Sequence, residues 1–161
     1  MSLWQEFLST TSIGAGDAAL RLLVATVLGF IIGLDRELRD KPLGMRTFML
    51  VSIGAALFSL ISVDLVATFA EAQQTEMDPG RVIQGVVIGI GFLGGGAIIQ
   101  TRGDIIGGTT GATIWAVGGI GMACGFGLYL HAVLATAATI FILTVLGVIE
   151  RWFGKDRGPD T

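Results

Sequence analysis

The chain has 161 residues, of which 52% are hydrophobic and only 14% are charged, and its mean hydropathy is +0.77. Soluble domains carry about 25% charged residues, so this composition excludes an ordinary soluble domain and indicates a membrane protein. The net charge of -3 at pH 7 is too small to indicate a nucleic-acid partner. The single cysteine, Cys124, excludes an intramolecular disulfide and lies in an apolar stretch, where a buried structural thiol is expected.

Five apolar stretches are expected to cross the membrane as helices, and with their connections they form a single transmembrane domain over residues 1–150. They cover residues 18–34, 47–66, 82–99, 111–124 and 128–149. The fourth is short for a bilayer core about 30 Å thick, so we expect it to be tilted, broken or shielded by its neighbours.

The two ends of the chain differ from the five spans. Residues 2–9 place apolar side chains on one helical face, which predicts a helix lying in the membrane interface, with a frayed terminus as the alternative. Residues 151–161 are polar and are expected to form a cytoplasmic tail.

Lysine and arginine residues are distributed unequally between the two ends of the predicted spans. The end that includes the 35–46 connection carries Arg36, Arg39, Lys41, Arg46, Arg102, Arg151, Lys155 and Arg157, whereas the other end carries Arg21 and Arg81. Because basic loops stay in the cytoplasm, the N-terminus is expected outside and the C-terminus inside. The sequence therefore predicts an all-α, polytopic membrane helix bundle of about five transmembrane helices.

Glycines are concentrated in the apolar part of the chain between Gly85 and Gly127. The spacing Gly89-x-Gly91-x-x-Gly94 matches the letters of a dinucleotide-binding motif, but that motif requires a preceding strand, and here it lies inside an apolar span. Glycines four residues apart let membrane helices approach backbone to backbone. We therefore predict helix packing for Gly29, Gly33, Gly89, Gly91, Gly94, Gly95 and Gly96. A break of the helix at the three consecutive glycines, with free carbonyls that hold an ion, stays an alternative.

Ionisable and polar residues gather near the two ends of the spans. The inner cluster is Asp35, Arg36, Glu37, Lys41, Arg46, Thr109 and Thr110, and the outer cluster is Asp64, Asp78, Arg81 and His131. Charges in membrane spans are functional candidates and are usually paired; Asp17 and Arg21, for example, lie four residues apart and face each other. Carboxylates are ligands that Mg²⁺ accepts, so Asp35, Glu37, Asp64 and Asp78 are weak metal candidates, and Mg²⁺ is the possible cofactor. The sequence pairs no nucleophile with a base, so no enzyme is predicted.

Several motifs resemble the signature of the MgtC/SapB family. The first is Gly33-Leu34-Asp35-Arg36-Glu37, followed by Lys41-Pro42-Leu43-Gly44-Met45-Arg46-Thr47. Others are Asp78 with Arg81–Gln84, Gly89–Gly94, Gly107–Thr110 with Ala112, Thr113 and Trp115, and Gly125–Tyr129, so that the likeness covers roughly residues 18–147. Two positions differ from the family pattern, with Asp35 where Glu is usual and Gly111 where Ala is common.

The resemblance implies a bacterial inner-membrane protein linked to magnesium homeostasis or envelope stress in a virulence-associated family. One branch of the family is a regulator that binds the membrane part of the ATP synthase and carries a soluble C-terminal domain, which is not expected in this chain. Our first hypothesis is a non-enzymatic regulator that acts through transmembrane helix contacts with such a membrane complex or in a homo-oligomer. The alternative is a transporter or channel for magnesium or another cation.

Overall fold

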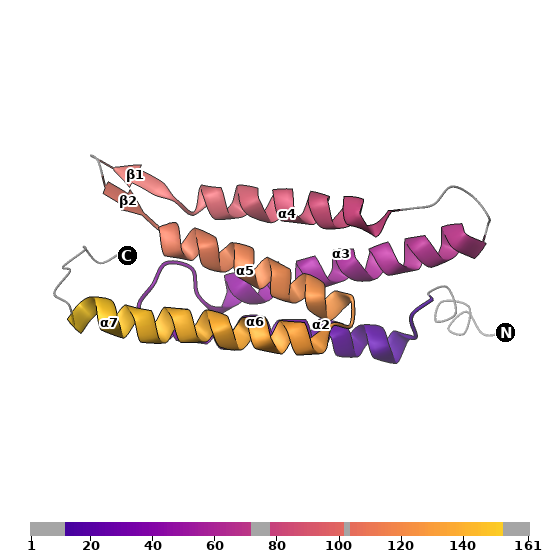
Figure 1. Cartoon of the computed structure of the whole chain (residues 1–161), viewed down its shortest axis with the longest axis horizontal. Helices are drawn as coiled ribbons and strands as arrows, with labels where there is room; N and C mark the ends of the chain where they lie inside the picture. Colours follow the sequence, from indigo (N-terminus) through magenta and orange to yellow (C-terminus); the bar gives the residue numbers. More distant parts are fainter. Residues whose placement is uncertain (1–11, 72–77, 102–103, 153–161) are drawn as a thin grey trace.

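The computed structural model describes residues 12–71, 78–101 and 104–152, and helices dominate it (Figure 1). Its elements in chain order are α2 (Ala15–Leu38), α3 (Met45–Glu71), α4 (Pro79–Gly96), β1 (Ile99–Thr101), β2 (Asp104–Ile106), α5 (Gly108–Gly125), α6 (Tyr129–Phe141), η1 (Ile142–Leu146) and α7 (Gly147–Trp152). The last three form one continuous helical rod with a π-helical turn, η1, in its middle. The predicted all-α bundle is therefore confirmed, while residues 2–9 and 153–161 lie outside the described part.

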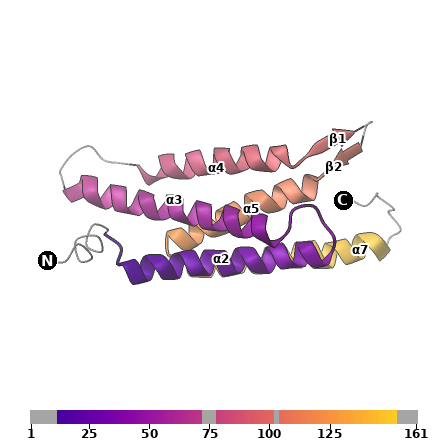
Figure 2. The same ribbon diagram turned by 180° about the vertical axis from the view of Figure 1, so that it is seen from behind.

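The helices run alternately in opposite directions along one long axis (Figures 1 and 2). The α2–α3 connection, the β1–β2 hairpin and α7 consequently lie at the same end of the bundle. Three helical stretches are long and apolar enough to cross a membrane by themselves: Ala15–Leu38, Met45–Phe69 and Tyr129–Ile149. Gly80–Gly96 is a shorter apolar helix. These lengths and compositions are those of a membrane protein.

Helix α4 ends earlier than the sequence predicts. The expected span of 82–99 would continue the helix to Ile99, but the helix ends at Gly96 and Ile99 lies in β1. Three consecutive glycines have weak helix propensity, so the helix stops where they end. Beyond the helix, Ile99 pairs with Ile106 and Thr101 pairs with Asp104 in an antiparallel hairpin. The backbone groups of this segment form hydrogen bonds between strands instead of within a helix.

Gly107 turns the chain from the hairpin into α5. Its φ of 87° lies in the left-handed region that L side chains rarely adopt, and a Cβ there would overlap the carbonyl oxygen of Ala97. Only glycine combines this dihedral with this close approach. The turn lets α5 begin at Gly108, three residues before the predicted boundary at residue 111.

Helix α5 is the centre of the bundle. It packs against α2, α3, α4 and α6, and most of its inward positions are buried, among them Ile114, Val117 and Ile120. Of the three arrangements expected for the short fourth span, the structure therefore shows a helix shielded by its neighbours. Its small side chains explain how four helices reach it at once, because a narrow helix brings its neighbours' backbones close.

Glycines make the closest contacts between helices. On α2, a Cβ at Gly29 would lie 2.8 Å from the Phe48 carbonyl oxygen, and one at Gly33 would lie 2.6 Å from the Met45 Cα. On α5, Gly121 abuts the Ser52 carbonyl in the same way. The contact between α4 and α5 is reciprocal, because Gly94 and Gly111 each lie against the other's carbonyl.

Four of the glycines expected to pack make no close helix contact in the described chain. A Cβ at Gly89, Gly91, Gly95 or Gly96 would have no atom within 4 Å among the residues described. Helix α4 packs against α5 and α3, but Gly89 borders an open space between α3 and α4 and makes no close helix contact. No helix of the described chain packs closely on these four glycines, and the packing expected of them stays a prediction.

A serine on α3 supplies a polar contact inside the bundle. The buried Ser52 hydroxyl donates a 2.7 Å hydrogen bond to the Ala25 carbonyl of α2, whereas the Ser59 hydroxyl donates to Ala55 in its own helix. We expect Ser52→Ala to lower the free energy of unfolding by about 0.6–1.7 kcal/mol, the range for interhelical hydrogen bonds in membrane proteins. Reversible unfolding in mixed micelles measures this loss. Ser59→Ala is the matched control, and an equal loss there would contradict an interhelical role for Ser52.

Candidate functional site

The inner cluster is organised by a contact between the end of α2 and the start of α5. Arg36 in the last turns of α2 has an exposed fraction of only 4%, and its Nη2 donates a hydrogen bond to the Thr110 hydroxyl in the first turn of α5. Its Nε is buried without a hydrogen-bond partner in the described structure. A buried cation thus joins two helices that are distant in sequence.

The carboxylate next to Arg36 is engaged by another arginine. Asp35 Oδ1 accepts a 2.9 Å bond from Arg39 Nε, one helical turn further along α2. Its second oxygen, Oδ2, is buried and has no partner among the residues described. Asp35 is therefore paired with Arg39 through one of its two oxygens.

Two further members of the inner cluster shape the α2–α3 connection. Glu37 Oε2 accepts a 3.0 Å hydrogen bond from the Met45 backbone N–H, at the start of α3, and a Cβ on Gly44 would overlap that oxygen. The Lys41 backbone N–H donates 3.1 Å to the Arg36 carbonyl and so caps the end of α2. These two hydrogen bonds shape the turn between α2 and α3.

The remaining members of the inner cluster lie on the surface. Arg46 and Thr109 are exposed. No described hydrogen bond or ion pair joins their side chains to Arg36 or to Asp35. The structure thus brings Arg36 together with Thr110, whereas Arg46 and Thr109 remain on the surface beside this contact.

The outer cluster does not form one site. Asp64 Oδ1 on α3 accepts bonds of 2.9 and 2.6 Å from the backbone N–H and hydroxyl of Ser12, and so holds the segment before α2. Asp78 caps α4 by accepting a 2.8 Å bond from the Gly80 N–H. Arg81 and His131 are exposed and contact neither carboxylate by a described hydrogen bond or ion pair.

One outer residue has a role that sequence reasoning missed. Arg21 forms the expected ion pair with Asp17, 2.6 Å long, but its Nη1 also donates 2.9 Å to the Gly125 carbonyl at the end of α5. Arg21 and Arg36 are therefore the two contacts of α2 with the ends of α5. Arg21 and Arg36 are as far apart in the sequence as Thr110 and Gly125, and each pair spans about 22 Å of helix. This equal spacing is the feature of the sequence that could have predicted both contacts.

The weak metal candidates do not come together. No group of three or more His, Cys, Asp or Glu side chains in the described ranges is arranged to hold a metal ion. Asp35, Glu37, Asp64 and Asp78 each already accept a hydrogen bond, as described above. Helix α4 is also unbroken through Gly94 and Gly95, so the backbone carbonyls there are not released by a break.

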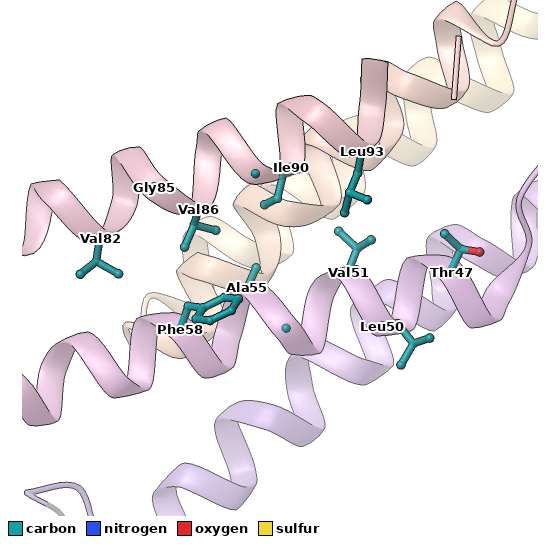
Figure 3. Close-up of a pocket in the computed structure, with 12 residues that line it drawn as sticks. Thr47, Leu50, Val51, Ala55, Phe58, Val82, Gly85, Val86, Ile90 and Leu93 are labelled. Atoms are coloured by element: carbon teal, nitrogen blue, oxygen red, sulfur yellow. The ribbon is translucent and has the colours of Figure 1, made fainter. Parts of the chain in front are cut away.

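A groove between α3 and α4 is the second candidate site (Figure 3). It has a volume of about 720 Å³, and apolar side chains and glycines line it. Val51, Ala55 and Phe58 of α3 face Val86 and Ile90 of α4 across it (Figure 3). Gly54, Gly85 and Gly89 belong to the same lining, and a Cβ at any of them would meet no described atom within 4 Å. Sequence reasoning did not predict this groove.

Comparison with known proteins gives consistent matches along the chain. SapB of Bacillus subtilis (strain 168) is 36% identical over 145 residues, which cover 89% of this chain and 61% of SapB. MgtC of Salmonella typhimurium (strain LT2) is 42% identical over 125 residues, which cover 77% of this chain and 48% of MgtC. YhiD of Escherichia coli (strain K12), which carries the provisional name of a magnesium transporter, is 36% identical over 126 residues, covering 78% of this chain and 59% of YhiD.

The chain thus spans about half to three fifths of the length of these relatives. No solved structure matches it significantly. The family model described as the MgtC family matches residues 22–152, from the second turn of α2 to the end of α7. The sequence resemblance to this family is confirmed, and the chain belongs to the MgtC family.

Proposed function

We propose that the chain is a non-enzymatic protein of the bacterial inner membrane, linked to magnesium homeostasis or envelope stress, that acts by binding another transmembrane helix. The observation that carries this proposal is the open, glycine-lined groove between α3 and α4. The occupant is a helix of a partner membrane complex, such as the ATP synthase, or of a second copy of this chain.

The shape and chemistry of the groove favour a helix as its occupant. Gly85 and Gly89 lie one helical turn apart on α4 and face the side of α3 that carries Gly54. Helices associate in lipid through close backbone approach at such small residues, because lipid tails are as apolar as leucine and give no hydrophobic driving force. The lining contains one polar side chain, Thr47, so an apolar helix enters without leaving polar groups unpaired.

Filling the groove tests the proposal. Gly89→Leu places a bulky side chain into open space, so we expect the fold to persist while function is lost. Function is measured as growth at low magnesium of a strain in which the gene is deleted and the variant is expressed. Gly91→Leu is the matched control, because Gly91 also has open space around it but does not line the groove. A crosslinker placed at residue 85 should capture a partner helix in native membranes, and this adduct should disappear in Gly89→Leu. Full growth and an unchanged adduct in Gly89→Leu would refute the proposal.

Cation transport is the competing function, favoured by the provisional name of YhiD. A flux measurement in liposomes with Mg²⁺ or K⁺ separates the two. We expect no flux above that of empty vesicles. Flux that Asp64→Asn or Asp35→Asn abolishes would overturn the regulator proposal in favour of transport.

A further inference from the structure

The contact between Arg36 and α5 joins two groups of the same electrostatic sign. The N-terminus of a helix carries a partial positive charge, equivalent to about half an elementary charge, and favours anions. Arg36 is a buried cation whose Nη2 reaches the third residue of that helix, Thr110. A cation in this position is destabilising unless an anion lies nearby.

The first turn of α5 also presents hydrogen-bond donors without acceptors. The residue before the helix, Gly107, has no side chain to cap it, and the first bond within α5 runs from the Gly111 N–H to the Gly107 carbonyl. The N–H groups of Gly108, Thr109 and Thr110 accordingly have no acceptor in the described structure. Gly108 and Thr109 are exposed, so these donors are reachable from outside.

The carboxylate nearest to Arg36 does not complete the site. Asp35 uses Oδ1 for its ion pair with Arg39, its Oδ2 has no partner, and no carboxylate in the described ranges lies within ion-pair distance of the Arg36 guanidinium. The Arg36 Nε is buried and has no partner, although a charged donor without an acceptor is costly to bury. This atom is a second observation, separate from the helix end, that favours a ligand oxygen here.

We propose that Arg36 and the first turn of α5 bind an oxyanion of the phosphate class. The free N–H groups of α5 and the guanidinium of Arg36 supply donors to its oxygens, as at other helix N-termini that bind phosphate. The site lies at the end of the bundle that carries the α2–α3 connection and the hairpin. The phosphate comes either from solution or from the headgroup of an anionic lipid.

A substitution that supplies a negative charge tests this site without removing Arg36. Thr109→Asp places a carboxylate in the first turn of α5, where acidic side chains stabilise a helix, so the variant should fold. We expect it to weaken, by at least about tenfold, the binding of the probe to which the original chain responds, either inorganic phosphate in micelles or phosphatidylglycerol in nanodiscs, because the carboxylate repels either phosphate at close range. Thr109→Asn, of the same size but neutral, should bind within about twofold of the original chain. Equal binding by the two variants would refute the proposal.

A second pair of variants tests the arginine. Arg36→Gln should lose the phosphate response, whereas Arg46→Gln, which removes an exposed cation at the start of α3, should keep it. If Arg36→Gln does not fold, the pair at Thr109 still decides the matter. An unchanged response in folded Arg36→Gln would overturn the proposed site.

The source of the phosphate is distinguished by two preparations of the full chain. In delipidated detergent micelles, a rise in melting temperature with inorganic phosphate, at matched ionic strength, identifies a soluble anion. A rise that appears only in nanodiscs containing phosphatidylglycerol, and not in those of phosphatidylcholine alone, identifies a lipid headgroup. A response to neither probe overturns the proposal.

Discussion

Gly121→Ala is expected to lower the free energy of unfolding by about 3 kcal/mol, the upper part of the range for overpacked cores. The new Cβ would fall on the backbone of α3, where the carbonyl group and the Cα of Ser52 already occupy the space. Backbone atoms cannot rotate away as the end of a side chain can, so α3 and α5 must separate. Because α5 also contacts α2, α4 and α6, this separation affects the whole bundle.

Substitution of alanine for Gly119, two residues away, is expected to raise the free energy of unfolding. A Cβ at Gly119 meets no described atom within 4 Å, so Gly119→Ala should stabilise α5 by about 0.5–1 kcal/mol through the better helix propensity of alanine. Equilibrium unfolding in mixed micelles, with helix content followed by circular dichroism, measures both variants. Equal effects of the two substitutions would show that the contact with Ser52 does not limit the approach of α3 and α5.

Gly107→Ala is expected to destabilise the chain and to weaken phosphate binding together. A side chain at the φ of 87° costs about 1–2 kcal/mol for the left-handed conformation, and overlap with the Ala97 carbonyl adds to this. Relief of the overlap moves the first turn of α5, and with it Thr110, away from Arg36. Calorimetry with inorganic phosphate and unfolding of the same sample measure the two effects.

Gly108→Ala is the control for this position. It has no described neighbour within 4 Å of its added Cβ and lies in the first helical turn, so stability should change by less than about 1 kcal/mol. The backbone N–H that faces the proposed ligand is retained. If Gly107→Ala kept full phosphate affinity despite its lower stability, the first turn of α5 would not be part of the binding site.

The helical bundle could be predicted because hydropathy and span length act locally along the chain. Runs of apolar residues long enough to cross a bilayer specify helices, since every backbone polar group must be satisfied within the segment. The exact end of α4 could not be predicted in the same way. Gly94 to Gly96 permit either a break or a continued helix, and the pairing of Ile99 with Ile106 in the hairpin decides it.

The roles of individual glycines and charges depend on tertiary contacts that sequence spacing does not specify. Gly29 and Gly89 each belong to a pair with one-turn spacing, but of the two only Gly29 lies in close contact with a neighbouring helix of the described chain. Arg36 was recognised as a candidate because charges near membrane spans are costly, but its partner Thr110 is 74 residues away. The groove between α3 and α4 depends on how these two helices pack in the bundle, and no local sequence pattern specifies that packing.

The two arginines of α2 set the axial position of α5. Because Arg21 holds the last carbonyl of α5 and Arg36 holds its first turn, sliding α5 along α2 in either direction breaks both contacts at once. Insertion of a single residue into either helix between these points would likewise put one arginine out of reach. The two arginines therefore fix the axial position of α5 against α2, whereas α4, which packs against α5 and α3, is held by neither of these two contacts.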